Sequence, residues 1–216
     1  MAEAAAAVRM TDACGDCQAR PTGSSAHLPR RLWAGKVAEG LVDSRGSAQL
    51  SSHNAELKIS ESGPLPGYRP CVGMMVVNPV GLVLIGERRG LVDGWQMPQG
   101  GIDRGEQPRD AALRELIEEI GTDRVEPVLE SSRWYAYDLP PEHIPKFHGG
   151  RYRGQSQKWF AFRFLGSDAD IDIGTVKPEF VRWRWALPHE VVALIVPFKR
   201  AVYAAVFEEF GPRLGS

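Results

Sequence analysis

Apolar residues gather in short runs in the middle of the chain, and the first runs predict a β-hairpin. The run Val72–Val77 has the nearly uninterrupted apolar character of a buried strand. A second run follows at Leu82–Gly86, and the residues between them, Asn78–Gly81, include the Asn, Pro and Gly that favour turns. Two such runs joined by a short turn are typical of a hairpin.

The pattern changes to a helical period near residue 108. Apolar side chains then recur at three- and four-residue spacing, at Ala112, Leu113, Leu116, Ile117 and Ile120. This spacing predicts a helix with one buried face. Pro108 suits the first turn of that helix, because the N–H that proline lacks would have no partner there.

The remaining apolar patterns predict further strands and two closing helices. The strand candidates are 126–129, 134–137, 158–164 and 180–186, and the helix candidates are 188–195 and 198–210. Strands interrupted by one long helix, with helices at the end, are typical of an α/β protein. The expected fold class is an α/β/α sandwich around a mixed sheet.

Residues 1–66 lack this patterning. They are rich in Ala, Gly and Ser with scattered charges, a composition that buries little apolar surface. We interpret residues 1–66 as an N-terminal extension, expected to be disordered, before a domain at residues 67–213. The extension has neither the charge pattern of a transit peptide nor the apolar core of a signal peptide.

The charge balance and the cysteines narrow the classes of partner and compartment. The formal net charge is −1 over 216 residues, so any anion must be bound by a local basic patch. No apolar run reaches the roughly 20 residues of a membrane span. Three cysteines without a framework spacing favour a reducing compartment, and we expect a cytoplasmic protein with no membrane or DNA partner.

Carboxylates line one face of the predicted helix. Glu115 lies three residues before Glu118 and four before Glu119, so the three side chains share a stripe. At an effective dielectric near 20, each close pair of charges costs roughly a few kcal/mol, which favours a cation among them. The segment offers no Cys or His, and carboxylate oxygens suit Mg²⁺ or Mn²⁺. For these three residues alone, a solvated acidic face is the alternative.

The spacing of charges and glycines continues on both sides of this stripe. Its fixed positions are Gly100, Glu106, Arg114, Glu115, Glu118, Glu119 and Gly121. This pattern resembles the Nudix box, and Thr122, where the family usually has an aliphatic residue, is its one departure. The resemblance implies the Nudix fold, hydrolysis of a pyrophosphate bond and a divalent metal cofactor. Mg²⁺ is the first choice, with Mn²⁺ or another divalent ion as alternatives.

Segments outside the box are similar to one branch of the family, the RNA pyrophosphohydrolases and the related dinucleoside polyphosphate hydrolases. The matching segments are 95–103, 154–160, 178–180, 183–185 and 198–200. The resemblance implies Glu115, Glu118, Glu119 and Glu179 as metal ligands. Of these, Glu118, Glu119 and Glu179 are the implied catalytic residues, with Glu179 as a ligand or as the base for the attacking water. Judged without the resemblance, Glu179 is an ordinary surface carboxylate.

The same resemblance implies a set of substrate-binding residues around the 5′ phosphates and the first nucleotides. They are Arg69, Arg89, Tyr137, Gln155, Gln157, Lys158, Phe198 and Lys199. Cations suit phosphates and aromatic rings suit bases, although each cation is equally compatible with an ordinary surface position. Arg151 and Arg153 are expected to contact RNA further along its backbone. Arg114 is expected to pair with Glu106 or a neighbouring glutamate.

Three functions are compatible with these residues. The first is removal of pyrophosphate from the 5′ end of triphosphorylated RNA, which primes messages for decay. The second is cleavage of dinucleoside polyphosphates such as diadenosine tetraphosphate. The third, of a different class, is a module that senses nucleotides without turnover, and the complete set of glutamates argues against it.

Overall fold

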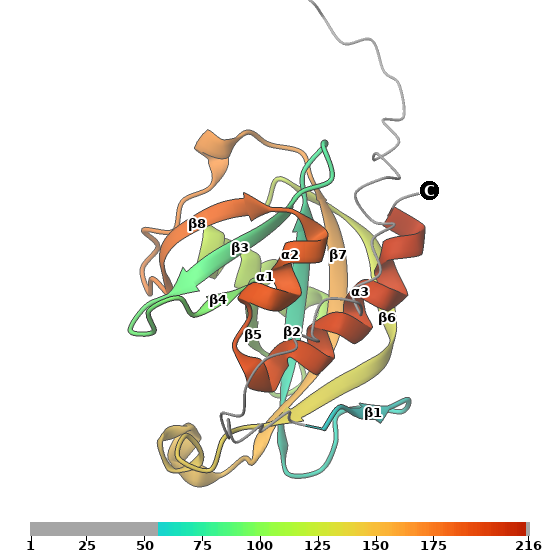
Figure 1. Ribbon diagram of the computed structural model, residues 1–216, viewed down its shortest axis with the longest axis vertical. Coiled ribbons are helices and arrows are strands. Elements are labelled where there is room, and N and C mark those ends of the chain that lie inside the picture. Colours follow the sequence, from blue (N-terminus) through green and yellow to red (C-terminus); the bar gives the residue numbers. More distant parts are fainter. Residues whose placement is uncertain (1–55, 215–216) are drawn as a thin grey trace, which may run out of the picture.

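A computed structural model of the chain describes residues 56–214 (Figure 1). Most of the predicted extension, and its expected disorder, therefore lies outside the described residues. Its last part does not, because Lys58–Ser60 form strand β1, which pairs antiparallel with β6 (Val125–Asp138). Leu57 beside this strand packs against the hydrophobic core. The folded unit thus includes residues before Gly67, the predicted start of the domain.

A mixed sheet forms the middle of the molecule. Its central strand β2 (Tyr68–Val77) pairs in parallel with β7 (Gly154–Phe164) along its whole length. The predicted hairpin of β2 and β3 (Val83–Arg88) is present, but the two strands pair only next to the turn. Beyond the turn, β3 pairs instead with β4 (Trp95–Gln96) and β8 (Phe180–Ala186). The resulting strand order is β1-β6-β7-β2-β3-β4.

Strand β6 joins two segments that the hydrophobic pattern predicted as separate strands, 126–129 and 134–137. Its pairing with the antiparallel β7 shifts register twice, between Pro127 and Leu129 and between Glu130 and Trp134. Such irregularities absorb extra residues without ending a strand. The strand therefore remains continuous from Val125 to Asp138.

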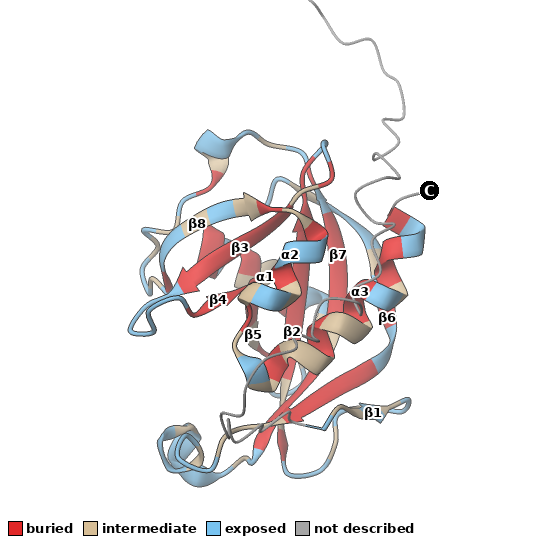
Figure 2. Ribbon diagram, in the orientation of Figure 1, coloured by how far each residue is buried: buried red, intermediate tan, exposed pale blue. Residues whose placement is uncertain are grey.

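Helices cover both faces of the sheet (Figure 1). Helix α1 (Pro108–Ile120) packs on one face, and α2 (Pro188–Leu194) and α3 (Arg200–Leu214) pack on the other. Because side chains alternate along a strand, neighbouring residues of β2 contribute to the two separate core clusters. The central strands β2, β3 and β7 are largely buried and the outer faces of the helices are exposed (Figure 2). This arrangement confirms the predicted α/β/α fold. None of the described helices has the length and apolarity to cross a membrane.

The buried face of α1 differs from the predicted one at a single turn. Ile117 is 50 % exposed, so its predicted burial is wrong, whereas Glu119 is 2 % exposed. Residues 112, 116 and 119 fall on one stripe of the helix, and that stripe faces the sheet. The consequence is a carboxylate inside the protein, beside the apolar side chains of Leu116 and Ile120.

Gly121 ends α1 in a left-handed conformation with φ 68°, and its N–H donates to the carbonyl of Ile117 at 3.1 Å. A Cβ at this position would lie 2.6 Å from the backbone oxygen of Asp172, so only glycine fits. Thr122, which departs from the family pattern, is buried, and its hydroxyl accepts the N–H of Arg124 at 3.1 Å. The hydroxyl thus closes the turn after the helix.

Candidate active site

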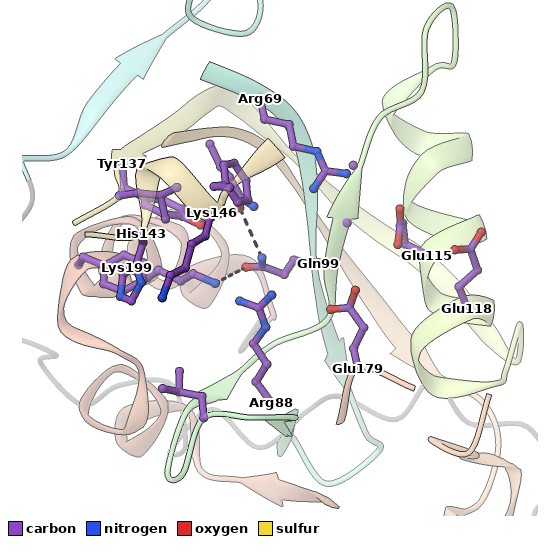
Figure 3. Close-up of a pocket in the computed structure, with 17 residues that line it drawn as sticks. Arg69, Arg88, Gln99, Glu115, Glu118, Tyr137, His143, Lys146, Glu179 and Lys199 are labelled. Carbon is purple, nitrogen blue, oxygen red and sulfur yellow. Dashed lines mark hydrogen bonds between the residues drawn. The ribbon is translucent and has the colours of Figure 1, made fainter. Parts of the chain in front are cut away.

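A cavity of about 480 Å³ opens at β5 (Gln99–Gly101), the short strand that pairs with β2 and precedes α1. All three residues of β5 line it. Carboxylates lie on the α1 side, from Glu115, Glu118 and Glu179 (Figure 3). Cations lie on the other side, from Arg69, Arg88, Lys146 and Lys199 (Figure 3). The cavity therefore has an acidic and a basic half.

Two glycines of β5 bring these halves close together. A Cβ on Gly100 would lie 1.8 Å from Cδ of Glu115, and a Cβ on Gly101 would lie 2.1 Å from a guanidinium nitrogen of Arg69. Any side chain at either position would displace a charged group. Because successive residues of a strand point to opposite faces, the carboxylate and the guanidinium approach the same backbone from opposite sides.

Arg114 organises the acidic half, and its predicted pairing with Glu106 is confirmed. Its Nε and Nη2 donate to the two oxygens of Glu106 at 2.8 and 2.9 Å. Nη2 also donates to the carbonyl of Gly101 at 2.8 Å, which fixes the loop against the helix. Nη1 reaches Glu115 at 2.8 Å and Glu118 at 3.2 Å. The hydrogen bonds from Arg114 lower the pKa of Glu106.

Glu119 does not line the cavity but lies buried behind the acidic half. One carboxylate oxygen accepts the N–H of Gln99 at 3.0 Å, and the other, also buried, has no hydrogen-bond partner within residues 56–214. Burial, and next the negative charge of Glu179, raise the pKa of Glu119 well above its ordinary value. Burial also raises the pKa of Glu115. An unpaired buried oxygen among neighbouring carboxylates fits a bound cation.

The carboxylates are close but do not yet converge on one point. In the described part of the chain, no three acidic, histidine or cysteine side chains form a ready-made metal site. Arg114 explains this, because it holds Glu115 and Glu118 through the same nitrogen. A cation among the carboxylates requires both side chains to rotate away from Arg114, which is a change of rotamer rather than of fold.

Lys199 dominates the basic half. It is 4 % exposed, and its ammonium donates to the side-chain oxygens of Gln96 at 3.0 Å and Gln99 at 2.9 Å. It also lies 5.7 Å from the ring centroid of Tyr137. Burial, and next the positive charge of Arg88, lower the pKa of Lys199 to about 7. A neighbouring anion would favour its charged form.

A chain of buried amides supports this lysine. Gln155 accepts the hydroxyl of Tyr137 at 2.7 Å and the amide of Gln157 at 3.0 Å. Gln157 also donates to Gln99 at 3.3 Å and accepts the indole N–H of Trp159 at 3.2 Å. Gln155 and Tyr137 line the cavity, as does Phe198. Gln157 does not line the cavity, but its hydrogen bonds position Gln99 and Gln155, which do.

Besides Gln157, two more predicted substrate contacts do not line the cavity. Lys158 is on the opposite face of β7 from Gln155, because the side chains of a strand alternate, and it pairs with Glu130 at 3.3 Å. Arg89 does not line the cavity, and its Nε donates to the carbonyl of Pro178 at 3.2 Å. The structure therefore does not bring Lys158 or Arg89 to the site.

Arg88 takes the position expected for Arg89. Simple alternation along β3 would point Arg88 to the α1 face, together with Leu84 and away from Ile85. Arg88 lines the cavity, whose acidic half is built by α1, next to a shift of register in the pairing with β8, where Val181 is the extra residue.

Three further residues of the cavity were not predicted from the sequence. They are His143, Lys146 and Phe147, which line it from the loop after β6. The mixture of basic and aromatic residues in that loop was the available signal.

Comparison with known proteins decides the family. The model of the NUDIX domain matches residues 67–206. The chain belongs to the Nudix family. Nudix proteins typically depend on a divalent metal, in agreement with the donor set around Glu119. The predicted resemblance is confirmed at the level of the branch, because the curated relatives reported next carry the name RNA pyrophosphohydrolase.

Two of these Nudix relatives show how much of the chain is shared. The RNA pyrophosphohydrolase of Cereibacter sphaeroides (strain ATCC 17029) is 55 % identical over 157 residues, which cover 71 % of this chain and 96 % of the relative. That of Rickettsia canadensis is 51 % identical over 144 residues, which cover 66 % and 89 %. Both matches span nearly the whole relative.

Solved Nudix structures agree on the fold. The E. coli dihydroneopterin triphosphate pyrophosphohydrolase superposes with a TM-score of 0.54 at 21 % identity, covering 68 % of this chain and 98 % of that structure. A binary complex of the C. elegans Ap4A hydrolase superposes with a TM-score of 0.52 at 17 % identity, covering 68 % and 97 %. At such identities the likeness supports the Nudix fold alone.

Proposed function

We propose that this Nudix protein is an RNA pyrophosphohydrolase, which removes pyrophosphate from the 5′ end of triphosphorylated RNA. The observation that carries the proposal is the division of the cavity at β5 into an acidic and a basic half. A phosphate chain needs cations along its length and a site for a divalent metal at the bond that breaks. The relatives named RNA pyrophosphohydrolase support the choice of RNA as substrate.

We assign the metal to Glu115, Glu118, Glu119 and Glu179, with Mg²⁺ as the first choice. The unpaired oxygen of Glu119 and the crowding of carboxylates support this set. A divalent cation bound there supplies positive charge that offsets the charge of the phosphates and lowers the pKa of water. The oxygen-only ligands favour a hard cation over zinc or copper.

The basic half binds the phosphates in this proposal. Arg69, Arg88 and Lys199 line the cavity, and no ion pair occupies any of them within residues 56–214. Their charges are therefore available to the substrate. Hydrogen bonds to two amide oxygens hold Lys199 in one rotamer, so the ammonium is already in place to contact the phosphates. Tyr137 and Phe198, with ring centroids 5.7 Å apart, form the wall for the first nucleoside.

Glu179 belongs to the acidic half and is exposed to the cavity (Figure 3). We assign Glu179 the role of base, so that its carboxylate accepts a proton from the attacking water. The water oxygen forms a bond to phosphorus, the bond to the bridging oxygen breaks, and pyrophosphate leaves from the 5′-monophosphorylated RNA. The arginines and Lys199 stabilise the charge that accumulates on the departing phosphates.

The test compares triphosphorylated RNA with diadenosine tetraphosphate at equal concentration in Mg²⁺. We expect release of pyrophosphate from RNA with the higher kcat/KM. Salt should weaken the RNA reaction more, with a slope near 0.7 per phosphate contact for a single strand. Faster turnover of the dinucleotide, with equal salt dependence, would favour a dinucleoside polyphosphate hydrolase instead. Binding of both without turnover would favour a sensor.

A further inference from the structure

Three aromatic rings lie together on the loop between β6 and β7, and none of them has been assigned to the metal or to the phosphates. Phe147 and His148 meet edge to face, with ring centroids 4.8 Å apart and planes at 89°. His148 and Tyr152 lie 6.1 Å apart at 77°. Phe147 lines the cavity, whereas His148 is exposed. The three rings therefore form an aromatic track that leads from the cavity wall to the surface.

The backbone of the loop keeps the middle ring exposed. His148 has φ 48°, and Gly149 and Gly150 follow with φ 65° and 77°. Three consecutive left-handed residues are uncommon, and this conformation costs a non-glycine residue about 1–2 kcal/mol. Strain of this kind is concentrated at functional positions. Here it holds an imidazole at the surface, beside the cavity.

Cations flank the aromatic track. Lys146 and Arg151 are exposed, and neither forms an ion pair with any residue between 56 and 214. Burial, followed by the positive charges of Arg69 and Arg151, lowers the pKa of His148. The ring lies in the field of a cavity arginine and a loop arginine. Aromatic rings between cations suit a polyanion that carries flat bases.

Arg153 does not belong to this set, contrary to the prediction from sequence. It donates to both oxygens of Asp138 at 3.0 and 3.3 Å. Asp138 also accepts hydrogen bonds from Lys58 and Tyr68. Arg153 is therefore part of the connection between β1 and β6, and Arg151 is the arginine that the loop leaves free for RNA.

We propose that the aromatic track of Phe147, His148 and Tyr152 binds the RNA beyond its first nucleotide. Bases stack on the rings, and Lys146 and Arg151 contact the backbone phosphates. Stacking on aromatic side chains tolerates any base, so the track adds affinity without strict sequence preference. The inference rests on the proposed function, since it extends the same substrate away from the same cavity.

The experiment measures kcat/KM for a triphosphorylated dinucleotide and for triphosphorylated RNA of about six nucleotides. For the wild-type protein we expect the longer RNA to be the better substrate. His148→Ala combined with Tyr152→Ala should lower kcat/KM for the longer RNA by about tenfold and leave the dinucleotide within about twofold. The conservative pair His148→Phe and Tyr152→Phe should keep the preference for length, because phenylalanine rings also stack on bases.

A charge variant tests the phosphate contact separately. Arg151→Gln should reduce the salt slope of the longer RNA by about 0.7. Arg163→Gln is the matched control, because this exposed arginine lies at the far end of β7 and pairs with Glu126. It should leave both the salt slope and the preference for length unchanged.

The outcomes separate the two proposals. Wild-type protein that releases pyrophosphate from both RNAs, with variants that keep the preference for length, overturns the aromatic track alone. Equal loss on both RNAs in the alanine pair overturns it as well, because the rings then support the cavity. Wild-type protein that releases no pyrophosphate from either RNA overturns the proposed function, and the track with it.

Discussion

Replacing Glu119 by glutamine separates two effects of a carboxylate buried beside a metal site. The carboxylate destabilises the metal-free fold, and it contributes to binding of the metal. Glu119 is 2 % exposed, one oxygen accepts the N–H of Gln99, and the other has no partner in the described residues. The glutamine keeps the acceptor for Gln99 and turns an NH₂ donor towards Glu179, the neighbour whose charge opposes ionisation of Glu119. The change therefore removes a buried charge and leaves the shape of the side chain intact.

The expected effect on stability has opposite signs with and without metal. An unsatisfied buried group costs about 1–3 kcal/mol, so in EDTA the variant should unfold at a higher temperature than the wild type. For a domain of this size, each kcal/mol raises Tm by about 2–4 °C. Saturating Mg²⁺ at about a hundredfold above Kd should stabilise the wild type by about 2.7 kcal/mol. The variant should gain much less, and its turnover should fall roughly 100-fold.

The assay is thermal unfolding in EDTA and in Mg²⁺, together with pyrophosphate release. Glu118→Gln is the control for burial, because its side chain is 53 % exposed and its pair with Arg114 contributes little to stability. We expect Glu118→Gln to lose the stabilisation by Mg²⁺ and to show the same Tm as the wild type in EDTA. Glu126→Gln, on an exposed pair away from the cavity, should change neither.

Two results would refute the reasoning. A lower Tm of Glu119→Gln in EDTA would show that the buried charge is satisfied in a way that the unpaired oxygen does not suggest. A wild-type Tm that does not respond to Mg²⁺ or Mn²⁺ would remove these carboxylates from metal binding.

Two further predictions concern the basic half and the first strand. Burial lowers the pKa of Lys199 from 10.5 to about 7, so the unfolded state binds the proton more tightly than the folded state. Burying the charged lysine therefore destabilises the fold fully below about pH 7 and not at all above about pH 10.5. Lys199→Met should therefore raise Tm most at or below pH 7 in melting curves, while KM for triphosphorylated RNA rises at least about tenfold; a gain that is largest at pH 10 would contradict the argument. Deleting residues 1–62 removes β1 and its ion pair from Lys58 to Asp138, so its Tm should be several degrees below that of a protein lacking only residues 1–55, and equal values would show that β1 adds nothing.

The spacing of apolar residues predicted the layers of the fold, because strands and α1 bury one or both faces and place apolar residues at those positions. Lys158 shows that the same rule reaches the site: it is one residue from Gln157, so alternation alone places the two on opposite faces. The amino-acid sequence was therefore sufficient to exclude Lys158 from the face that Gln157 occupies. It was not sufficient to orient α1, because Ile117 and Glu119 are both compatible with a helix, and only contact with the sheet decides which is buried.

Arg88 and the loop after β6 depend on features without a period. Arg88 lies where the pairing of β3 with β8 shifts register, and the residue types of this segment do not predict that irregularity. In the loop, His148 adopts a left-handed conformation that is uncommon for residues other than glycine. The glycines that follow predict a turn, but they do not predict which ring it exposes. The chemistry of the cavity was therefore predictable by residue type, and its geometry only in part.

The backbone at Gly100 and Gly101 also prevents an ion pair between Glu115 and Arg69. Glu115 and Arg69 come so close to β5 that, without the strand between them, they would neutralise each other as an ion pair. The peptide backbone keeps them on opposite faces while both remain open to one cavity. Arg69 therefore remains available for a phosphate, while Glu115 pairs with Arg114 and has to leave that arginine to bind a cation.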